Sequence, residues 1–143
     1  MNSIQKEILI TRKERGFQLI TQEIVNNLPE IEVFNHGILN LFLLHTSASL
    51  TINENTDYKV QKDLERYFTN LVPEKEHIYQ HDDEGLDDMP AHIKSVLIGN
   101  NLNIPIKNGS LVMGTWQGVF LCEHRNHGSC RKILATIIGT KKE

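Results

Sequence analysis

Hydrophobic and polar positions change their spacing several times along the chain, and each change predicts an element. Residues 4–10 alternate poorly but hold enough apolar side chains for a strand, and residues 17–20 form its return strand after a turn at 14–16. Residues 38–44 are apolar except for Asn40, which places large side chains on both faces of a strand. Such a strand is typical of the middle of a sheet that is covered on both sides.

Two or three helices are predicted from capping residues and from apolar side chains that recur every three or four positions. Thr21 can cap a short helix. Thr56 can cap a longer amphipathic helix, which Pro73 ends. A polar loop then leads into a further helix, with Asp88 as its cap and Pro90 in its first turn.

The second half of the chain contains the strongest hairpin signal. Asn108-Gly109 favours a type I′ turn, because both residues tolerate a positive φ, and residues 104–106 and 110–122 flank it as strands. A second hairpin is predicted to turn at 126–128 and to return through 130–139. Strands therefore dominate the predicted structure.

The composition fits a single domain over residues 1–143 with an α+β fold of largely antiparallel layers, since no repeat or linker divides the chain. The content is 39% hydrophobic and the net charge is -3, with no basic patch, so nucleic acid is not an expected partner. No apolar run reaches the roughly 20 residues that span a bilayer, and residues 1–10 lack the pattern of a secretory signal. We therefore expect a cytoplasmic protein without membrane contact, in which Cys122 and Cys130 are reduced thiols.

Three of the seven histidines lie where a metal ligand can be held still. His45 ends the apolar strand, His81 opens the acidic loop, and His92 lies one turn into the following helix. If they converge, three neutral imidazoles with a fourth position open suit Zn²⁺ in a catalytic role, with Fe or Ni as geometric alternatives. Unrelated polar roles for the three rings are the competing interpretation.

Acidic and amide side chains surround these histidines in the sequence. The acidic loop can be a solvated segment with a helix cap, can support a metal-binding histidine by accepting its ring N–H, or can hold Mg²⁺ beside a phosphate. Glu54 follows His45 and is the candidate general acid or base, while Asn55 or Asp57 can simply cap the next helix. The acidic residues of the loop are Asp82, Asp83, Glu84, Asp87 and Asp88.

Trp116 and Gln117 stand in the middle of an otherwise apolar predicted strand. They can belong to the core, or Trp116 can stack on a flat heteroaromatic ring while the Gln117 amide bonds to ring atoms. Arg125, Arg131 and Lys132 flank the last predicted turn as solvated charges or as a phosphate clamp.

Five stretches together resemble the YjbQ family of secondary thiamine-phosphate synthase enzymes, from about residue 4 to residue 140. They read "RGF", "FLLHTSASLTINENTD", "HDDEGLDDMPAHIKSVLIG", "IPIKNGSLVMGTWQGVFLCEHR" and "ATIIGT". Many members of that family continue after "GTWQ" to an acidic "DGPR" turn, whereas this chain has "EHRNHGSCRK". The choice between Arg131 and Lys132 as the phosphate-binding residue is therefore open.

The resemblance implies a β-sandwich-like α+β domain that forms a homotrimer, with a pocket at the subunit boundary. It implies metal ligands at His45, His81 and His92, with Glu54, Asn55, Trp116 and Gln117 nearby. Together with the residue chemistry, this makes Glu54 and Arg131 the candidate catalytic residues and Asn55, Trp116 and Gln117 the candidate substrate contacts. The implied reaction joins a pyrimidine diphosphate to a thiazole phosphate with loss of pyrophosphate. Two rival functions stay open: a metal-dependent hydrolase or lyase acting on another small metabolite, and a trimeric binding protein without catalysis.

Overall fold

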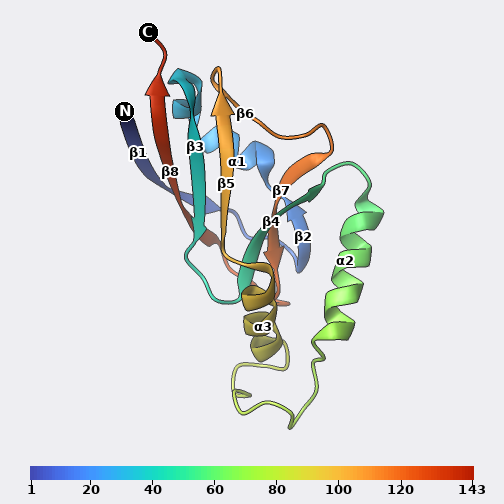
Figure 1. The fold of residues 1–143 in the computed structure, drawn as a ribbon. Coiled ribbons are helices and arrows are strands. Elements are labelled where there is room, and N and C mark those ends of the chain that lie inside the picture. The colour runs from blue at the N-terminus through green and yellow to red at the C-terminus, as the bar shows by residue number, and fades with distance from the viewer.

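The computed structural model describes residues 1–143 and shows an α+β fold with two antiparallel sheets and three α-helices (Figure 1). The strands are β1 (Asn2–Ile10), β2 (Gly16–Leu19), β3 (Phe34–Leu43), β4 (Ala48–Glu54), β5 (Asn101–Lys107), β6 (Ser110–Leu111), β7 (Gln117–Glu123) and β8 (Arg131–Lys141). The helices are α1 (Thr21–Asn27), α2 (Tyr58–Leu71), α3 (Asp88–Ile98) and the 3-10 helix η1 (Pro29–Val33). No helix is both long and apolar enough to cross a membrane.

The two sheets pack face to face around the main core. The larger sheet has the strand order β1-β8-β3-β5-β6, and the smaller has the order β2-β7-β4. Alternate side chains of strands from both sheets point into the space between them, as in other β-sandwiches, and form one cluster of 19 buried residues. This cluster includes Ile8, Leu41 and Ile137 from the larger sheet and Leu50 and Val119 from the smaller one.

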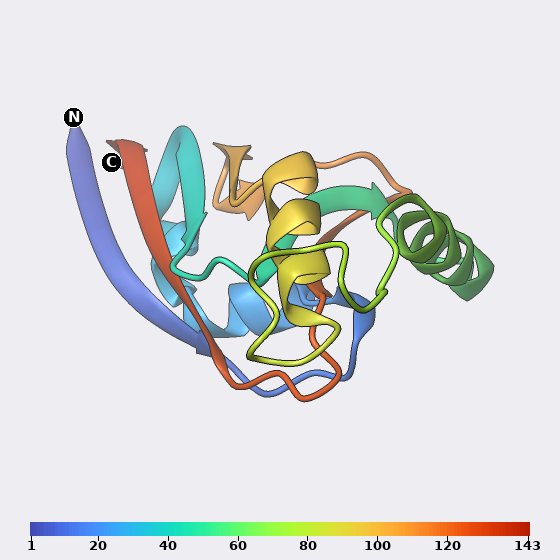
Figure 2. The same ribbon diagram turned by 90° about the horizontal axis from the view of Figure 1, so that it is seen from below.

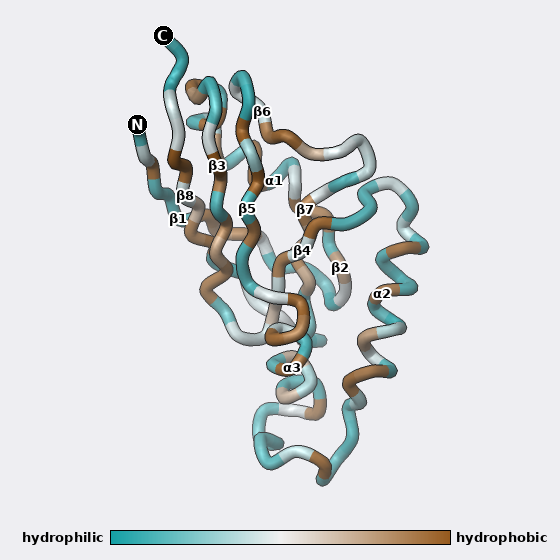
Figure 3. The backbone as a smooth tube through the Cα atoms, viewed as in Figure 1, coloured by the Kyte–Doolittle hydropathy of each residue, from teal (hydrophilic) through white to brown (hydrophobic).

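Helices α2 and α3 cover the other face of the smaller sheet. A second, smaller cluster joins Phe17, Phe120 and Cys122 of the sheet to side chains of the helices, including Leu64 and Phe68. In the view from below, α3 lies between the strands β1 and β8 on one side and α2 on the other (Figure 2). The loop between α2 and α3 forms one end of the molecule and is mostly hydrophilic (Figures 1 and 3).

The strand that is covered on both faces is β7 and not β3. β3 lies inside its sheet between β8 and β5, as expected of an interior strand. Its outward side chains are nevertheless exposed in the single chain, with Ile38 at 53% and Phe42 at 42%. β7 is buried from residue 118 to residue 123, because the larger sheet covers one face and the helices cover the other.

The turn residues predicted one hairpin correctly and two hairpins incorrectly. Asn108 and Gly109 form the predicted two-residue turn between β5 and β6, with φ values of 50° and 77°. The predicted N-terminal hairpin is wrong, because β1 pairs with β8 whereas β2 pairs with β7. The predicted hairpin at 126–128 is also wrong, since β7 and β8 belong to different sheets. Both connections cross from one sheet to the other instead of reversing within one.

The predicted caps Thr56, Thr21 and Asp88 are wrong, whereas Asp57, the alternative cap for the longer helix, is confirmed. Asp57, one residue after Thr56, caps α2 by accepting a hydrogen bond from the Lys59 N–H at 3.0 Å. The Thr21 hydroxyl accepts a hydrogen bond from the Val119 N–H on β7 and does not cap α1. Asp88 lies inside α3 as its first residue, with its side chain turned to other partners.

Candidate metal centre

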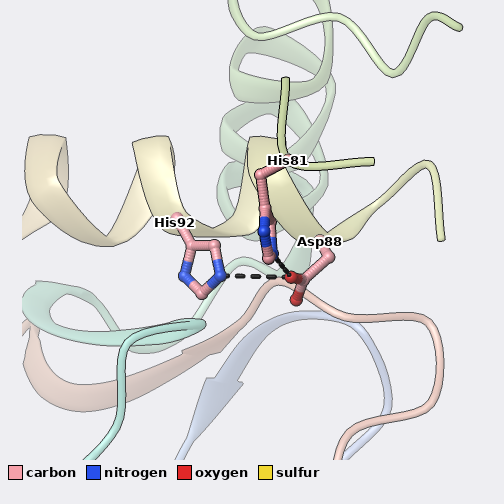
Figure 4. A group of neighbouring side chains, drawn as sticks. All are labelled: His81, Asp88 and His92. Atoms are coloured by element: carbon pink, nitrogen blue, oxygen red, sulfur yellow. Dashed lines mark hydrogen bonds and ion pairs between the residues drawn. The ribbon is translucent and has the colours of Figure 1, made fainter. Parts of the chain in front are cut away.

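Two residues of α3 and one residue of the preceding loop bring their side chains together at one end of the molecule (Figure 4). Asp88 and His92 are four positions apart on the helix, so they share one face. His81 reaches the same point from the loop between α2 and α3. One potential metal-binding atom from each of the three lies within 4.8 Å of the other two.

The two imidazoles meet at a single carboxylate oxygen. Asp88 Oδ2 lies 2.6 Å from His81 Nε2 and 3.1 Å from His92 Nε2. The ring centroids of the two histidines are 5.3 Å apart, with the ring planes tilted by 55°. The group therefore presents two nitrogen donors and one oxygen donor from three directions.

The backbone orients His92 as it does many metal ligands. His92 Nδ1 donates a hydrogen bond to the Thr46 carbonyl at 2.7 Å. A metal ligand needs a neutral ring, and with its one proton on Nδ1 the ring would direct the lone pair of Nε2 at an ion beside Asp88. His81 has an acidic neighbour behind its ring, with Asp83 Oδ1 3.8 Å from its Nδ1.

Charge also holds the carboxylate of Asp88 in its ionised form. Asp88 is only 1% exposed, and Arg125 Nη1 donates to its Oδ1 at 2.5 Å. Burial opposes ionisation, but the hydrogen bond from His81 and the charges of His92 and Arg125 prevail, so the pKa of Asp88 lies below its usual value. The same hydrogen bond raises the pKa of His81 above its usual value.

The donor set fits a small divalent cation of the zinc type. Zn–N bonds of about 2.0–2.1 Å place the ligand atoms of a tetrahedral site about 3.3 Å apart. The separations of the two nitrogens from Asp88 Oδ2, 2.6 and 3.1 Å, are near this value, and all three donor atoms lie within 4.8 Å of one another. An ion here would displace the proton that His81 and Asp88 share.

The third predicted ligand, His45, lies outside this group within one chain. Its Nε2 accepts a hydrogen bond from the Lys132 N–H at 2.8 Å, which continues the pairing with β8 after β3 has ended. The neutral ring therefore carries its proton on Nδ1. Burial and then the charge of Arg131 lower the pKa of His45. His45 and His92 nevertheless share a cavity of about 310 Å³, which Thr46, Ser95 and Asn100 also line.

Four predicted substrate and catalytic residues lie together in a different region, where β4 leads into α2. Glu54 Oε2 accepts hydrogen bonds from the N–H groups of Thr56 and Asp57, both at 2.8 Å. The Asn55 amide donates to the carbonyls of residues 115 and 117, and the Gln117 amide oxygen accepts from the Gly114 N–H.

The indole of Trp116 is left to solvent in this region. Trp116 is 61% exposed and lies in the loop before β7, so the strand that we predicted over 110–122 is interrupted there. This region lies apart from the metal group. β4 leads into the first turn of α2, whereas α3 begins near the last turn of α2 (Figure 1).

The predicted phosphate-binding residue Arg131 is buried in an ion pair. It is 4% exposed, and its guanidinium donates to Glu123 and to Ser47. All three guanidinium nitrogens are thereby engaged within the protein, which leaves none directed at a ligand. Lys132 is exposed, and its backbone holds His45.

Sequence reasoning gave too little weight to Asp88 and Arg125. The spacing Asp-x-x-x-His within residues 88–92 was a signal for Asp88, because a helix places these two side chains on one face. No comparable signal marked Arg125, which comes from the loop after β7 and reaches Asp88 only in the folded chain.

The structure thus defines an α+β sandwich with a His-Asp-His group at the start of its third helix. The chain belongs to the UPF0047 protein YjbQ-like family, whose model matches residues 6–140. UPF0047 protein YjbQ of Escherichia coli O157:H7 is 50% identical over 135 residues, which cover 94% of this chain and 97% of that protein. The resemblance that the sequence motifs indicated is confirmed.

Solved structures show the same fold. A YjbQ/UPF0047 family protein from Clostridium acetobutylicum is 32% identical and has a TM-score of 0.78, with 94% of this chain and 99% of that chain covered. A YbjQ-like protein from Sulfolobus solfataricus has a TM-score of 0.83 at 22% identity, with 96% and 98% covered. The first likeness agrees with the family, the second shows the fold alone, and neither assigns a reaction.

Proposed function

We propose that this chain is a metal-dependent enzyme acting on a small metabolite, with a divalent ion, Zn²⁺ in the first place, held by His81, Asp88 and His92. The observation that carries the proposal is the convergence of three donor atoms within 4.8 Å. Catalytic zinc sites use three protein ligands and keep a further position for water or substrate. When bound, the ion would supply Lewis-acid polarisation or an activated water.

The residues around the ion have separate tasks in this proposal. Thr46 holds the ring of His92 through its carbonyl, so Nε2 keeps its direction. His45 lines the cavity beside His92. As a neutral ring with its proton on Nδ1, it would donate a hydrogen bond to a substrate oxygen there instead of acting as a third ligand.

Thiamine-phosphate formation is the first reaction to test. In this reaction a new carbon–nitrogen bond forms between the thiazole and the pyrimidine, and the carbon–oxygen bond to the leaving pyrophosphate breaks. A flat platform for the pyrimidine and a cation near the leaving group would favour it. The exposed Trp116 and the proposed ion are suited to these tasks, but they lie in different regions of one chain.

A site that uses both regions would need a neighbouring protomer, and we propose the homotrimer that the family resemblance implies. The outer face of the larger sheet supports such an assembly, because Ile38, Phe42 and Ile138 are 53%, 42% and 50% exposed there. A hollow of about 540 Å³ lies over the same face, lined by Ile38, Asn40 and Ile138 among others. Light scattering on the purified protein measures the number of protomers, and a monomer would contradict this part of the proposal.

The test of the function uses protein purified without a histidine tag. We expect about one zinc ion per chain and formation of thiamine phosphate from the two phosphorylated precursors, both lost in His92→Ala. Equal activity in the wild type and the variant would exclude the proposed centre. Mixed assemblies of His92→Ala and Trp116→Ala should regain activity if each site combines two protomers, and should stay inactive if it does not.

Hydrolysis is a second candidate, because the cavity beside His92 can hold a small substrate next to one of the proposed metal ligands. A metal-activated water would be the nucleophile in that case. Turnover of a phosphorylated compound without any second substrate, abolished in His92→Ala, would favour hydrolysis over synthesis. Metal-dependent binding of the same compounds without turnover would favour a binding protein.

A further inference from the structure

Arg125 connects the loop after β7 to both carboxylates at the start of α3. Its Nη1 donates to Asp88 Oδ1 at 2.5 Å, and its Nε donates to Asp87 Oδ2 at 3.2 Å. Its Nη2 donates to the Glu84 carbonyl at 3.0 Å. The backbone N–H of the next residue, Asn126, donates to the same oxygen of Asp87 at 2.7 Å. The guanidinium is therefore held in one orientation by three acceptors.

This arrangement divides the two oxygens of Asp88 between two kinds of partner. Oδ1 faces the guanidinium, whereas Oδ2 faces the two imidazoles. A cation that bound both oxygens at once would approach the positive charge of Arg125, and the two charges would repel each other across a carboxylate that is itself buried. Asp88 therefore offers an ion its Oδ2 and not both of its oxygens.

Arg125 restrains the neighbouring carboxylate in the same way. Asp87 is 8% exposed and directs its Oδ2 to Arg125 and to the Asn126 N–H. Without these partners, the carboxylate of Asp87, which precedes Asp88 in the chain, would be a free oxygen donor for an ion bound there. Divalent ions differ in their need for such ligands: Mg²⁺, Ca²⁺ and Mn²⁺ favour six or more oxygens, whereas Zn²⁺ is satisfied by four ligands that include imidazoles.

We infer that Arg125 is a positioning residue that restricts Asp88 to one metal-binding oxygen and thereby makes the centre selective for a four-coordinate ion such as Zn²⁺. The inference rests on the proposed metal centre. It assigns to Arg125 a role in ion selection, and it assigns no contact between Arg125 and the substrate.

The test measures the coordination of the ion directly, in the full chain. Co²⁺ replaces Zn²⁺ as a probe, because its visible absorption is intense in four-coordinate sites and weak in sites of higher coordination number. Competition with a chromophoric chelator gives the affinities for Zn²⁺ and Mn²⁺. In Arg125→Met we expect weaker Co²⁺ absorption and a preference for Zn²⁺ over Mn²⁺ that falls by about tenfold or more, the usual range for partners of metal ligands.

Arg15→Met is the matched control. Arg15 is also a partly buried arginine in ion pairs, with Glu74 and Glu65, and it does not contact Asp88. We expect this variant to keep the Co²⁺ spectrum and the ion preference of the wild type. If Arg125→Met does not fold, Arg125→Gln, which also removes the charge but can still hydrogen-bond, is judged by the same two measurements.

The possible failures can be told apart. Unchanged Co²⁺ absorption and unchanged preference in the folded Arg125 variant would overturn the inference and leave the metal centre intact. A wild type that binds neither Zn²⁺ nor Co²⁺ would overturn the metal centre itself, and the inference with it.

Discussion

Two polar regions of this chain look alike in sequence and differ in how their side chains are used. The segment at Glu54 and Asn55 and the group of His81, Asp88 and His92 both offer several polar atoms near the end of a secondary-structure element. At Glu54 and Asn55, those atoms bind backbone groups of the same chain. In the histidine group, three side-chain atoms face one another, so an ion can replace their mutual hydrogen bonds. A high density of polar residues is therefore a poor sign of a ligand site, whereas donor atoms that converge on one point are a good one.

The largest expected effect that separates the two regions is on metal affinity. Removal of one imidazole in His92→Ala should weaken Zn²⁺ binding by about a hundredfold or more, because each ligand carries a large share of the binding free energy of a three-ligand site. Asn55→Ala, which removes a polar side chain from the other region, should leave the affinity unchanged. Chelator competition at constant pH measures both.

Thermal unfolding gives an independent measure of the same difference. Saturating Zn²⁺ should raise the melting temperature of the wild type and of Asn55→Ala but not that of His92→Ala, because an ion that binds only the folded state stabilises it. Equal stabilisation of all three proteins would show that the ion binds elsewhere.

The buried pair of His124 and Ser49 gives a prediction for the pH dependence of stability, because His124, like Asn55, bonds within the protein. His124 is 2% exposed, and its Nε2 lies 2.8 Å from the Ser49 hydroxyl. Burial, together with the positive charges of Lys94, Arg15 and Arg131, lowers the pKa of His124 to about 3. Like Asn55, this residue uses its polar atom inside the protein, so protonation should oppose folding.

The sign of the effect follows from proton binding. Between the unfolded pKa of about 6.5 and the folded pKa, the unfolded chain binds more protons, so the free energy of unfolding falls as the pH falls. At pH 5 the loss due to His124 should be about 2 kcal/mol relative to pH 7.5. Urea unfolding of the wild type and of His124→Gln at both pH values isolates this contribution, since other titrating groups cancel in the difference. A pH dependence that is identical in the two proteins would contradict the prediction.

The sequence predicted the fold class, because the hydrophobic pattern that defines helices and strands is local. It did not predict which strands pair, because pairing joins strands that are far apart in the chain. The turn at Asn108 and Gly109 is set by the φ values that those two residues allow, and it was found. β1 and β2 are neighbours in sequence but pair with β8 and β7. Which strands they pair with depends on which apolar faces pack together in the sandwich, and residues 11–15, which connect them, carry no signal for this pairing.

The same distinction applies to the candidate site. His81 and His92 come together as predicted, and the helical spacing from Asp88 to His92 could have added the carboxylate. His45 could not be excluded from the group by sequence, because the hydrogen bond that occupies it comes from the backbone of Lys132, which any residue offers. Arg125 and Arg131 are both flanking charges in sequence, and only folding turns one toward Asp88 and buries the other beside Glu123.

The smallest expected effect is on the free energy of unfolding of the metal-free protein. Here the variant at Asn55 should lose stability and the variant at His81 should not, the reverse of the effects on metal affinity. Asn55→Ala removes two hydrogen bonds, to the carbonyls of residues 115 and 117, and should lower the free energy of unfolding by about 1–2 kcal/mol. Asn101→Ala is the matched control, because Asn101 is exposed and its amide bonds only to the side chain of Asn100. It should change stability by less than about 0.5 kcal/mol.

His81→Ala in metal-free protein should resemble the control, because the His81 side chain is 41% exposed and its removal leaves Asp88 paired with Arg125. Urea unfolding in the presence of a chelator compares the three variants. A loss for His81→Ala as large as that for Asn55→Ala would mean that the contacts within the histidine group stabilise the fold. The two regions would then not differ in the way proposed, with one stabilising the fold and the other binding a ligand.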